Sequence, residues 1–181
     1  MKISAIAPWF GSKRTLAPEI VRQLGPHQYY FECCAGSMAV VMAKEPSEHE
    51  TACDLHGALT NLALCVQRDE QASTLFNRLQ RVLYGDEIYQ RSKDWLAEAG
   101  DDYKGQQIGM SDEGGIQPPF SFPDVEWAYH YFIASWMGRN GVAGTARVNY
   151  QIATRWTQGG GSGPLRFRSA VDSIPDWCNR L

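Results

Sequence analysis

A strand, a sharp turn, a helix and a second strand follow one another between residues 29 and 61, and this unit constrains the fold most. The apolar run 29–31 predicts a buried strand, and small residues then turn the chain into a helical stretch over 38–44. Ser37 is placed to cap that helix, whose first N–H groups favour a polar or anionic ligand. Asp54 lies about 20 residues on, the spacing of the carboxylate that holds ribose hydroxyls in dinucleotide-binding folds. The unit therefore predicts a nucleoside-cofactor site.

Five stretches, two of them inside the unit 29–61, carry a family resemblance. Residues 8–13 read P-W-F-G-S-K and precede a predicted helix over 16–24. They resemble the N-terminal motif W-x-G-[GS]-K of Dam-type (D12 class) DNA adenine-N6 methyltransferases. Residues 32–38 resemble the family's next motif, E-P-F-x-G-x-G, through Glu32 and Gly36, whereas Cys33, Cys34 and Met38 depart from it.

The family's acidic motif, D-x-N-x-x-L-x-N, is similar to residues 54–61. Asp54, Leu59 and Asn61 match, and His56 replaces the first Asn. Residues 134–141 look like the segment that opens the family's DNA-contacting region, and residues 166–181 are similar to the stretch before its catalytic strand. The resemblance thus spans nearly the whole chain.

The resemblance implies an α/β, Rossmann-like S-adenosylmethionine-dependent methyltransferase fold with an incomplete sheet and a helical, loop-rich DNA-contacting region. Residues 1–85 are expected to form the cofactor-binding part, and residues 86–181 the helical, Arg/Gly-rich DNA-recognition region that leads back toward the catalytic strand. An incomplete sheet exposes strand edges and apolar faces, which predicts self-association or a complementary chain.

The resemblance also implies roles for individual residues. Trp9 and Lys13 would line the cofactor and target-base pocket. The methionine part of S-adenosylmethionine would be wrapped by Glu32, Ala35, Gly36 and Ser37. Asp54 would accept hydrogen bonds from the ribose hydroxyls. Plainer readings are a core Trp, a Lys at a helix N-terminus, where the macrodipole disfavours its charge, and an ordinary tight turn at Gly36. For Asp54 the functional reading is favoured, because an unpaired carboxylate at the end of an apolar run is costly.

The family's catalytic motif, D-P-P-Y, is absent from the sequence. In the family its first residue accepts a hydrogen bond from the adenine amino group and its aromatic ring stacks on the flipped base. Residues 117–120 read Q-P-P-F, but they follow a polar stretch instead of a buried strand. We therefore expect an N-terminal portion, truncated or cleaved, that has no catalytic residues of its own and is inactive alone.

Charge is distributed unevenly, although the formal net charge is only −3. Acids outnumber bases over residues 86–126, whereas residues 139–168 contain no Asp or Glu and interleave arginines with aromatics. Such a segment suits phosphate contacts and stacking, and the alternative is a solvated loop that pairs with the acidic region. The residues predicted to contact double-stranded DNA are Arg139, Asn140, Arg147, Arg155, Arg166 and Arg168.

Composition limits the remaining classes. No apolar run approaches the roughly 18 residues of a membrane span and no signal-peptide pattern is present, so a cytoplasmic protein without membrane contact is expected. The five cysteines form no C-x-x-C pair and the histidines lack ligand spacing, which predicts reduced thiols and no metal site.

Apolar periodicity predicts further helices over 59–66, 75–83, 86–99 and 125–137, and a Gly-rich loop or hairpin over 141–163. Three alternatives stay open for function. They are a non-catalytic nucleic-acid or cofactor-binding module, a methylase of RNA or free nucleotides, and an NAD-dependent oxidoreductase, which the missing G-x-G-x-x-G disfavours.

Overall fold

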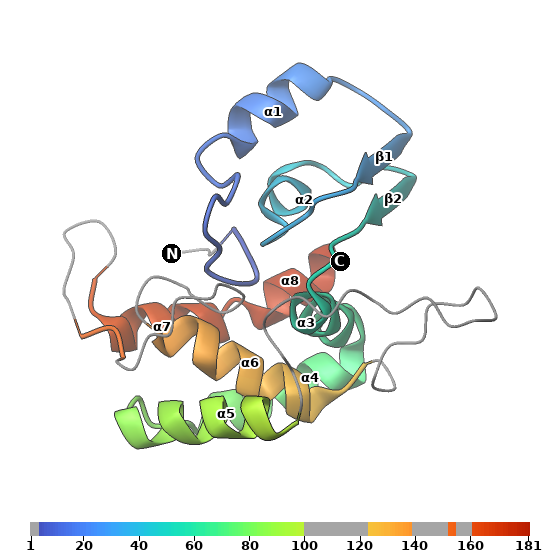
Figure 1. Ribbon diagram of the computed structural model, residues 1–181. Coiled ribbons are helices and arrows are strands. Elements are labelled where there is room, and N and C mark those ends of the chain that lie inside the picture. The colour runs from blue at the N-terminus through green and yellow to red at the C-terminus, as the bar shows by residue number, and fades with distance from the viewer. Residues whose placement is uncertain (1–3, 100–122, 139–151, 155–160) are drawn as a thin grey trace.

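The computed structural model describes residues 4–99, 123–138, 152–154 and 161–181 (Figure 1). Its helices and strands are α1 (Ala17–Leu24), β1 (Tyr29–Glu32), α2 (Ala39–Ala43), β2 (His49–Ala52), α3 (Gly57–Gln67), α4 (Asp69–Leu79), α5 (Asp86–Glu98), α6 (Val125–Met137), α7 (Gly163–Val171) and α8 (Ile174–Arg180). The predicted helices are confirmed in this part of the chain. None of the helices described combines the length and apolar character needed to cross a bilayer.

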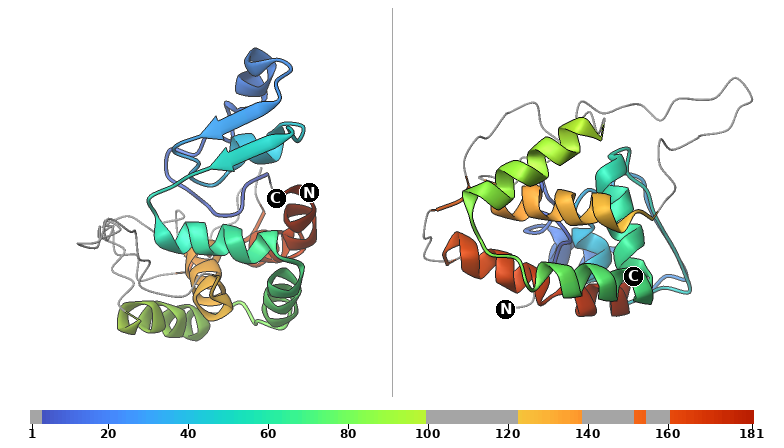
Figure 2. Two further views of the ribbon diagram at one scale, coloured as in Figure 1. Left: turned by 90° about the vertical axis from the view of Figure 1, so that its right-hand side faces the viewer. Right: turned by 90° about the horizontal axis from the view of Figure 1, so that it is seen from below.

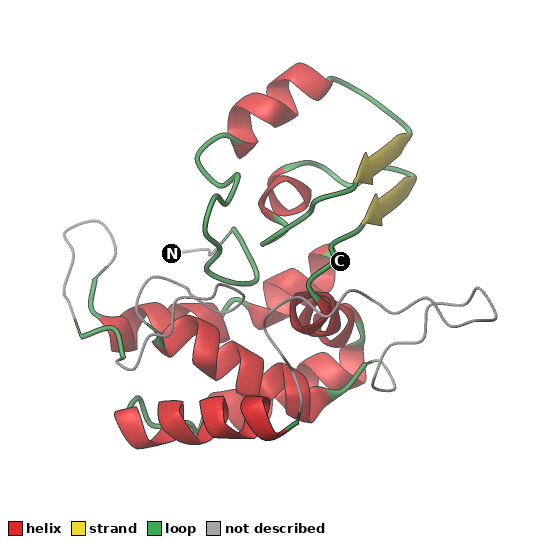
Figure 3. Cartoon of the chain, in the orientation of Figure 1, coloured by secondary structure: helices red, strands yellow, loops and turns green. Residues whose placement is uncertain are grey.

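The described elements form two layers. The strands lie with α1 and α2 in the upper layer of Figure 1, and helices α3 to α8 make up the lower layer, as the colouring of Figure 3 shows. The chain is therefore a helix-rich α/β protein, compatible with a methyltransferase-like fold. The boundary at residue 85 falls between α4 and α5, and separate roles for the two parts stay a prediction.

The described sheet consists of β1 and β2, which run parallel with Tyr29 opposite His49 and Glu32 opposite Ala52. The prediction that residues 29–31 are buried is wrong, because Tyr29 is 72% and Phe31 67% exposed. Side chains alternate between the two faces of a strand, and only the face of Tyr30 and Glu32 is covered.

Helix α6 forms the centre of the core and packs against α3, α4, α5 and α7 (Figure 2). It is apolar around most of its circumference, as expected of a buried helix. Its start is fixed by Asp124, which accepts the Trp127 N–H at 3.0 Å. The buried amide of Asn61 holds Asp124 in turn, since it donates to the backbone oxygen and accepts from the backbone N–H, both at 2.8 Å. This interaction joins α3 to α6.

Charged residues after α2, on β2 and at the end of α8 join the two layers. The Lys44 side chain, only 2% exposed, contacts the Glu50 carboxylate and donates to Ser47 Oγ at 2.7 Å. Arg180 at the end of α8 donates to both oxygens of Glu50, at 2.8 and 3.2 Å. Glu50 on β2 is thus the shared partner of a buried ammonium and a guanidinium from the last helix.

We expect Glu50→Gln to lower the free energy of unfolding by about 3 kcal/mol at pH 7, because Lys44 would stay buried without its counter-charge. Burial alone would raise the pKa of Glu50, but hydrogen bonds from Arg180, Lys44 and the Ser47 N–H outweigh it and lower the pKa to about 2. The stabilisation is therefore complete above the ordinary carboxyl value of 4.5 and is lost as the pH falls toward 2.

Urea denaturation of the wild type and variant at pH 7 and pH 3 measures both effects. Glu45→Gln, the same change at an exposed position, is the control. Equal losses for the two variants would show that Glu50 contributes no buried charge pair.

Candidate functional site

The turn after β1 reverses the chain through two residues in the left-handed region. Gly36 has φ 53° and Met38 has φ 59°, and Met38 is the one non-glycine residue with positive φ among those described. The prediction that Ser37 caps the following helix is wrong, because Met38 occupies the cap position without a side-chain hydrogen bond. The Ser37 hydroxyl lies instead 2.8 Å from Ser12 Oγ, which holds the turn against the N-terminal segment.

Asp54 fixes the position of this turn. One carboxylate oxygen accepts the Gly36 N–H at 2.7 Å and the other accepts the His56 N–H at 3.0 Å. Each carboxylate oxygen can accept a second hydrogen bond, so the half-buried Asp54 keeps acceptor capacity toward a ligand. The turn, the end of β2 and the start of α3 therefore meet at one carboxylate.

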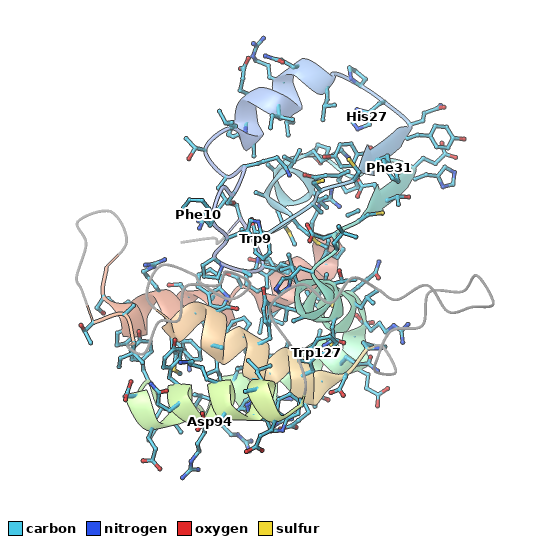
Figure 4. All side chains as sticks on the ribbon, viewed as in Figure 1. Trp9, Phe10, His27, Phe31, Asp94 and Trp127 are labelled. Atoms are coloured by element: carbon cyan, nitrogen blue, oxygen red, sulfur yellow. The ribbon has the colours of Figure 1, made fainter. Side chains whose placement is uncertain are left out.

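The indole of Trp9 covers the same turn. A Cβ placed on Gly36 would lie 3.2 Å from the Trp9 ring, so only glycine lets the two segments approach this closely. The Trp9 and His56 rings meet edge to face, with centroids 5.3 Å apart. Figure 4 shows Trp9 between the upper and lower layers.

His56, which stands where the family motif has Asn, starts α3. Its Nδ1 accepts the Leu59 N–H at 3.2 Å, as an N-cap side chain does. Burial lowers the pKa of His56, and the nearby Asp54 carboxylate opposes this shift only in part. A neutral imidazole suits the role of hydrogen-bond acceptor.

Lys13 and Glu32 form an ion pair at the base of the turn. Lys13 Nζ lies 3.0 Å from Glu32 Oε1 and donates to the Cys34 carbonyl oxygen at 2.5 Å. Glu32 is buried, and its second oxygen accepts the Tyr30 hydroxyl at 3.0 Å. Burial and this contact with Glu32 raise the pKa of Tyr30. The contact between Lys13 and Oε1 is a charge pairing without the alignment of a hydrogen bond.

The cofactor residues predicted from the sequence thus gather around one turn. Ala35, also buried, donates its N–H to the Cys53 carbonyl oxygen at 2.9 Å and extends the strand pairing into the turn. Their binding roles stay predictions. Sequence reasoning gave no role to Tyr30 or to His56, although His56 lies inside the acidic motif, where it replaces the first Asn.

The predicted DNA-contacting residues are only partly described. Four of them lie outside the described residues: Arg139, Asn140, Arg147 and Arg155. Residues 117–120, which read Q-P-P-F, also lie outside the described residues. Arg166 and Arg168 were expected in the Gly-rich, arginine-bearing loop. They lie instead on helix α7, which begins at Gly163. Arg168 donates to the Gln80 carbonyl oxygen at 3.0 Å and lies 3.3 Å from Asp172, so it is already engaged.

Arg14 is a basic residue near the site that sequence reasoning missed. Its side chain keeps contact with solvent, yet surrounding protein atoms lower its pKa, and the charge of Arg166 lowers it further. The structure therefore brings two cations together from opposite ends of the chain. In the segments described, no three His, Cys, Asp or Glu side chains converge as metal ligands.

We expect Gly36→Ala to lower the free energy of unfolding by about 2 kcal/mol, about 1 kcal/mol of it from the left-handed backbone and the rest from the Trp9 contact. Gly11→Ala is the control, because Gly11 also has a positive φ, of 74°, but no atom within 4 Å of the added Cβ. Urea denaturation of both variants isolates the contribution of Trp9. Equal losses would mean that Trp9 tolerates the added methyl group.

Of two comparisons with known proteins, one finds a match. A comparison with curated proteins finds no match. The family model for the D12 class N6 adenine-specific DNA methyltransferase matches residues 9–113, more than half of the chain. The matched span begins at Trp9 and contains the turn around Gly36 and the carboxylate of Asp54. We conclude that this chain belongs to the D12 class N6 adenine-specific DNA methyltransferase family.

Proposed function

We propose that the chain binds S-adenosylmethionine at the turn between β1 and α2, as part of an enzyme that methylates adenine N6 in DNA. The observation that carries this proposal is the Asp54 carboxylate, which is held by Gly36 and His56 and keeps acceptor capacity. A carboxylate fixed at the carboxyl end of a parallel strand suits the two ribose hydroxyls of a nucleoside.

The other residues of the turn fit the remaining parts of the cofactor. Trp9 lies directly over Gly36 and offers an aromatic surface at the edge of the turn. Lys13 is held by Glu32, so its ammonium is positioned before a ligand arrives. Preorganised groups of this kind lower the cost of binding.

When bound, the cofactor supplies an activated methyl group on a positively charged sulfur. The chain's own residues would align that group with the acceptor nitrogen, and alignment alone is a large share of catalysis for such a transfer. The group that stabilises the adenine amino nitrogen belongs to the D-P-P-Y motif, which the 181 residues do not contain. We therefore propose binding without transfer by this chain alone.

The first test is calorimetric titration with S-adenosylhomocysteine. We expect saturable binding that Asp54→Ala weakens roughly 50-fold, because charged hydrogen bonds to the ribose are lost. Asp94→Ala is the control, since Asp94 lies on α5 at the far side of the lower layer (Figure 4). Circular dichroism of each variant verifies that the fold is retained.

Four outcomes would decide between the alternatives. Competition by NAD would favour the oxidoreductase alternative, and equal binding by the two variants would remove Asp54 from the site. Methylation of DNA by this chain with labelled S-adenosylmethionine would refute the proposal that it is inactive alone. If the chain binds cofactor and DNA but no methyl group is transferred, either by the chain alone or with a complementary chain, a non-catalytic binding module would be favoured.

We propose further that Arg14 and Arg166 contact the phosphates of double-stranded DNA. The positive charge of Arg166 acts on the Arg14 guanidinium, and an anion that contacts both groups would be favoured. Arg166 is exposed on α7, on the same element as Arg168. This arrangement supports DNA contact and carries no information about base sequence.

We expect Arg166→Ala to weaken binding to a DNA duplex roughly 5-fold at 0.1 M salt and to reduce the slope of log K against log salt by about 1. Fluorescence anisotropy across a salt series measures both quantities. Arg91→Ala on α5 removes an arginine that pairs with Glu87 and should change neither. An unchanged slope for Arg166→Ala would exclude a phosphate contact, and tighter binding to an RNA duplex would favour the RNA alternative.

The open face of the sheet supports the proposal that two copies of the chain associate. Tyr29 and Phe31 leave two large aromatic side chains in solvent beside two strand edges that no other described strand pairs. Exposed edges and apolar faces of this kind drive association.

We expect light scattering to show a dimer at a concentration of about 100 μM, and Phe31→Ser to shift it to the monomer. Leu83→Ser is the control, because Leu83 is 80% exposed outside the sheet. A wild-type chain that is monomeric under these conditions would leave the open face to a complementary chain.

A further inference from the structure

Three cysteines surround the turn that holds the candidate cofactor site. Cys33 and Cys34 follow β1 directly, Cys53 follows β2 directly, and all three are exposed. The other two thiols differ, since burial raises the pKa of Cys65 to about 12 and Cys178 is partly buried in α8. The proposed methyl transfer uses none of these thiols.

The register of the sheet brings Cys33 and Cys53 opposite each other. Glu32 pairs with Ala52, and the Cys53 N–H donates to the Glu32 carbonyl oxygen at 2.8 Å. The next aligned pair along the two parallel strands is therefore Cys33 and Cys53. Neighbouring strands lie about 4.8 Å apart, within the Cα separation of about 4.4 to 6.8 Å that a disulfide spans.

Both thiols lie just beyond the last aligned pair of the sheet. Tyr29 and His49, the first aligned pair, stack with ring centroids 5.0 Å apart. Cys33 directly follows Glu32 and Cys53 directly follows Ala52, and both are exposed in this structure. Their backbones are adjacent, because the Cys53 N–H donates to the carbonyl oxygen of Glu32.

Cys34 is a less suitable partner for Cys33. Adjacent Cα atoms are about 3.8 Å apart across a trans peptide, which is shorter than a disulfide normally spans. A hydrogen bond with the Cys33 thiol raises the pKa of Cys34, so Cys34 is less often the thiolate that reacts.

We propose that Cys33 and Cys53 form a reversible disulfide across the carboxyl ends of β1 and β2, which makes the candidate cofactor site sensitive to peroxide. The Cys33 thiolate attacks one peroxide oxygen, the O–O bond breaks, and hydroxide leaves and is protonated to water. The Cys53 thiolate then attacks the sulfenic sulfur, the S–S bond forms, the S–O bond breaks and a second water leaves. Two thiols are oxidised and one peroxide is reduced to two waters.

The disulfide would alter the turn because Cys53 and its neighbour Asp54 both hold backbone N–H groups of the turn. It draws the two Cβ atoms to about 3.8 Å. The Cys53 carbonyl oxygen accepts the Ala35 N–H, and the next residue, Asp54, holds the Gly36 N–H, so both contacts shift. Weaker cofactor binding by the oxidised chain follows, and this consequence rests on the proposed function.

Peptide mapping tests the pairing. The full chain is treated with one equivalent of hydrogen peroxide, remaining thiols are alkylated, and the protein is digested with trypsin, which cleaves after Lys44 and separates the two cysteines. We expect a loss of two thiols, a linked peptide pair containing Cys33 and Cys53, and reversal by dithiothreitol. The link should persist in Cys34→Ser and disappear in Cys33→Ser and Cys53→Ser.

A link between Cys33 and Cys34, a link found only between two chains, or no link would overturn the proposal. In calorimetry, oxidation should weaken S-adenosylhomocysteine binding roughly tenfold in the wild type and leave Cys53→Ser unaffected. Equal affinities of oxidised and reduced wild type would overturn the effect on the site. A reduced chain that binds no S-adenosylhomocysteine would refute the proposed function and leave the peptide map valid.

Discussion

The carboxylate of Asp54 is the contact on which the candidate site depends. It joins the Gly36 turn after the first strand to the first residues of α3 through two backbone N–H groups. Without Asp54 each of these donors would lose this partner, and leaving a backbone group unsatisfied is costly. Trp9 and the Lys13–Glu32 pair then pack around a turn whose position is already fixed. The same acid therefore serves the fold and remains accessible to a ligand.

The sequence was sufficient to predict helices α1 to α6 and the order of the motifs, but it did not predict α7 or α8. Apolar periodicity is strong in α3 to α6, because each buries one or more faces in a common core. The exposure of Tyr29 and Phe31 was not predictable, since an aromatic run reads as buried whether or not another element covers it. The prediction that Ser37 caps α2 was wrong for a local reason. The chain reversal continues to Met38, and the Ser37 hydroxyl contacts Ser12 instead.

Contacts between distant segments account for most of what the sequence left undetermined. The charge of Arg166 lowers the pKa of Arg14, and Glu50 accepts hydrogen bonds from Arg180, although each pair is separated by well over a hundred residues. A single sequence contains no information about which charges meet after folding. The motifs could therefore predict that Trp9, Gly36 and Asp54 belong together, whereas the arginine next to the site and the charged link to α8 required the structure. The resemblance of residues 8–13, 32–38 and 54–61 to the family motifs predicted the first group.

Met38 shows how this chain has altered a family pattern. It stands where the motif E-P-F-x-G-x-G has its last glycine, and its φ of 59° explains why glycine suits the position. A left-handed backbone costs a side-chain-bearing residue about 1 to 2 kcal/mol. The Met38 side chain is buried in the core, and burial of that size contributes about 2 kcal/mol in the opposite direction. Backbone strain and core packing are thus balanced at one residue, so restoring the family glycine would exchange a strained turn for a cavity beneath α2 with little net change in stability.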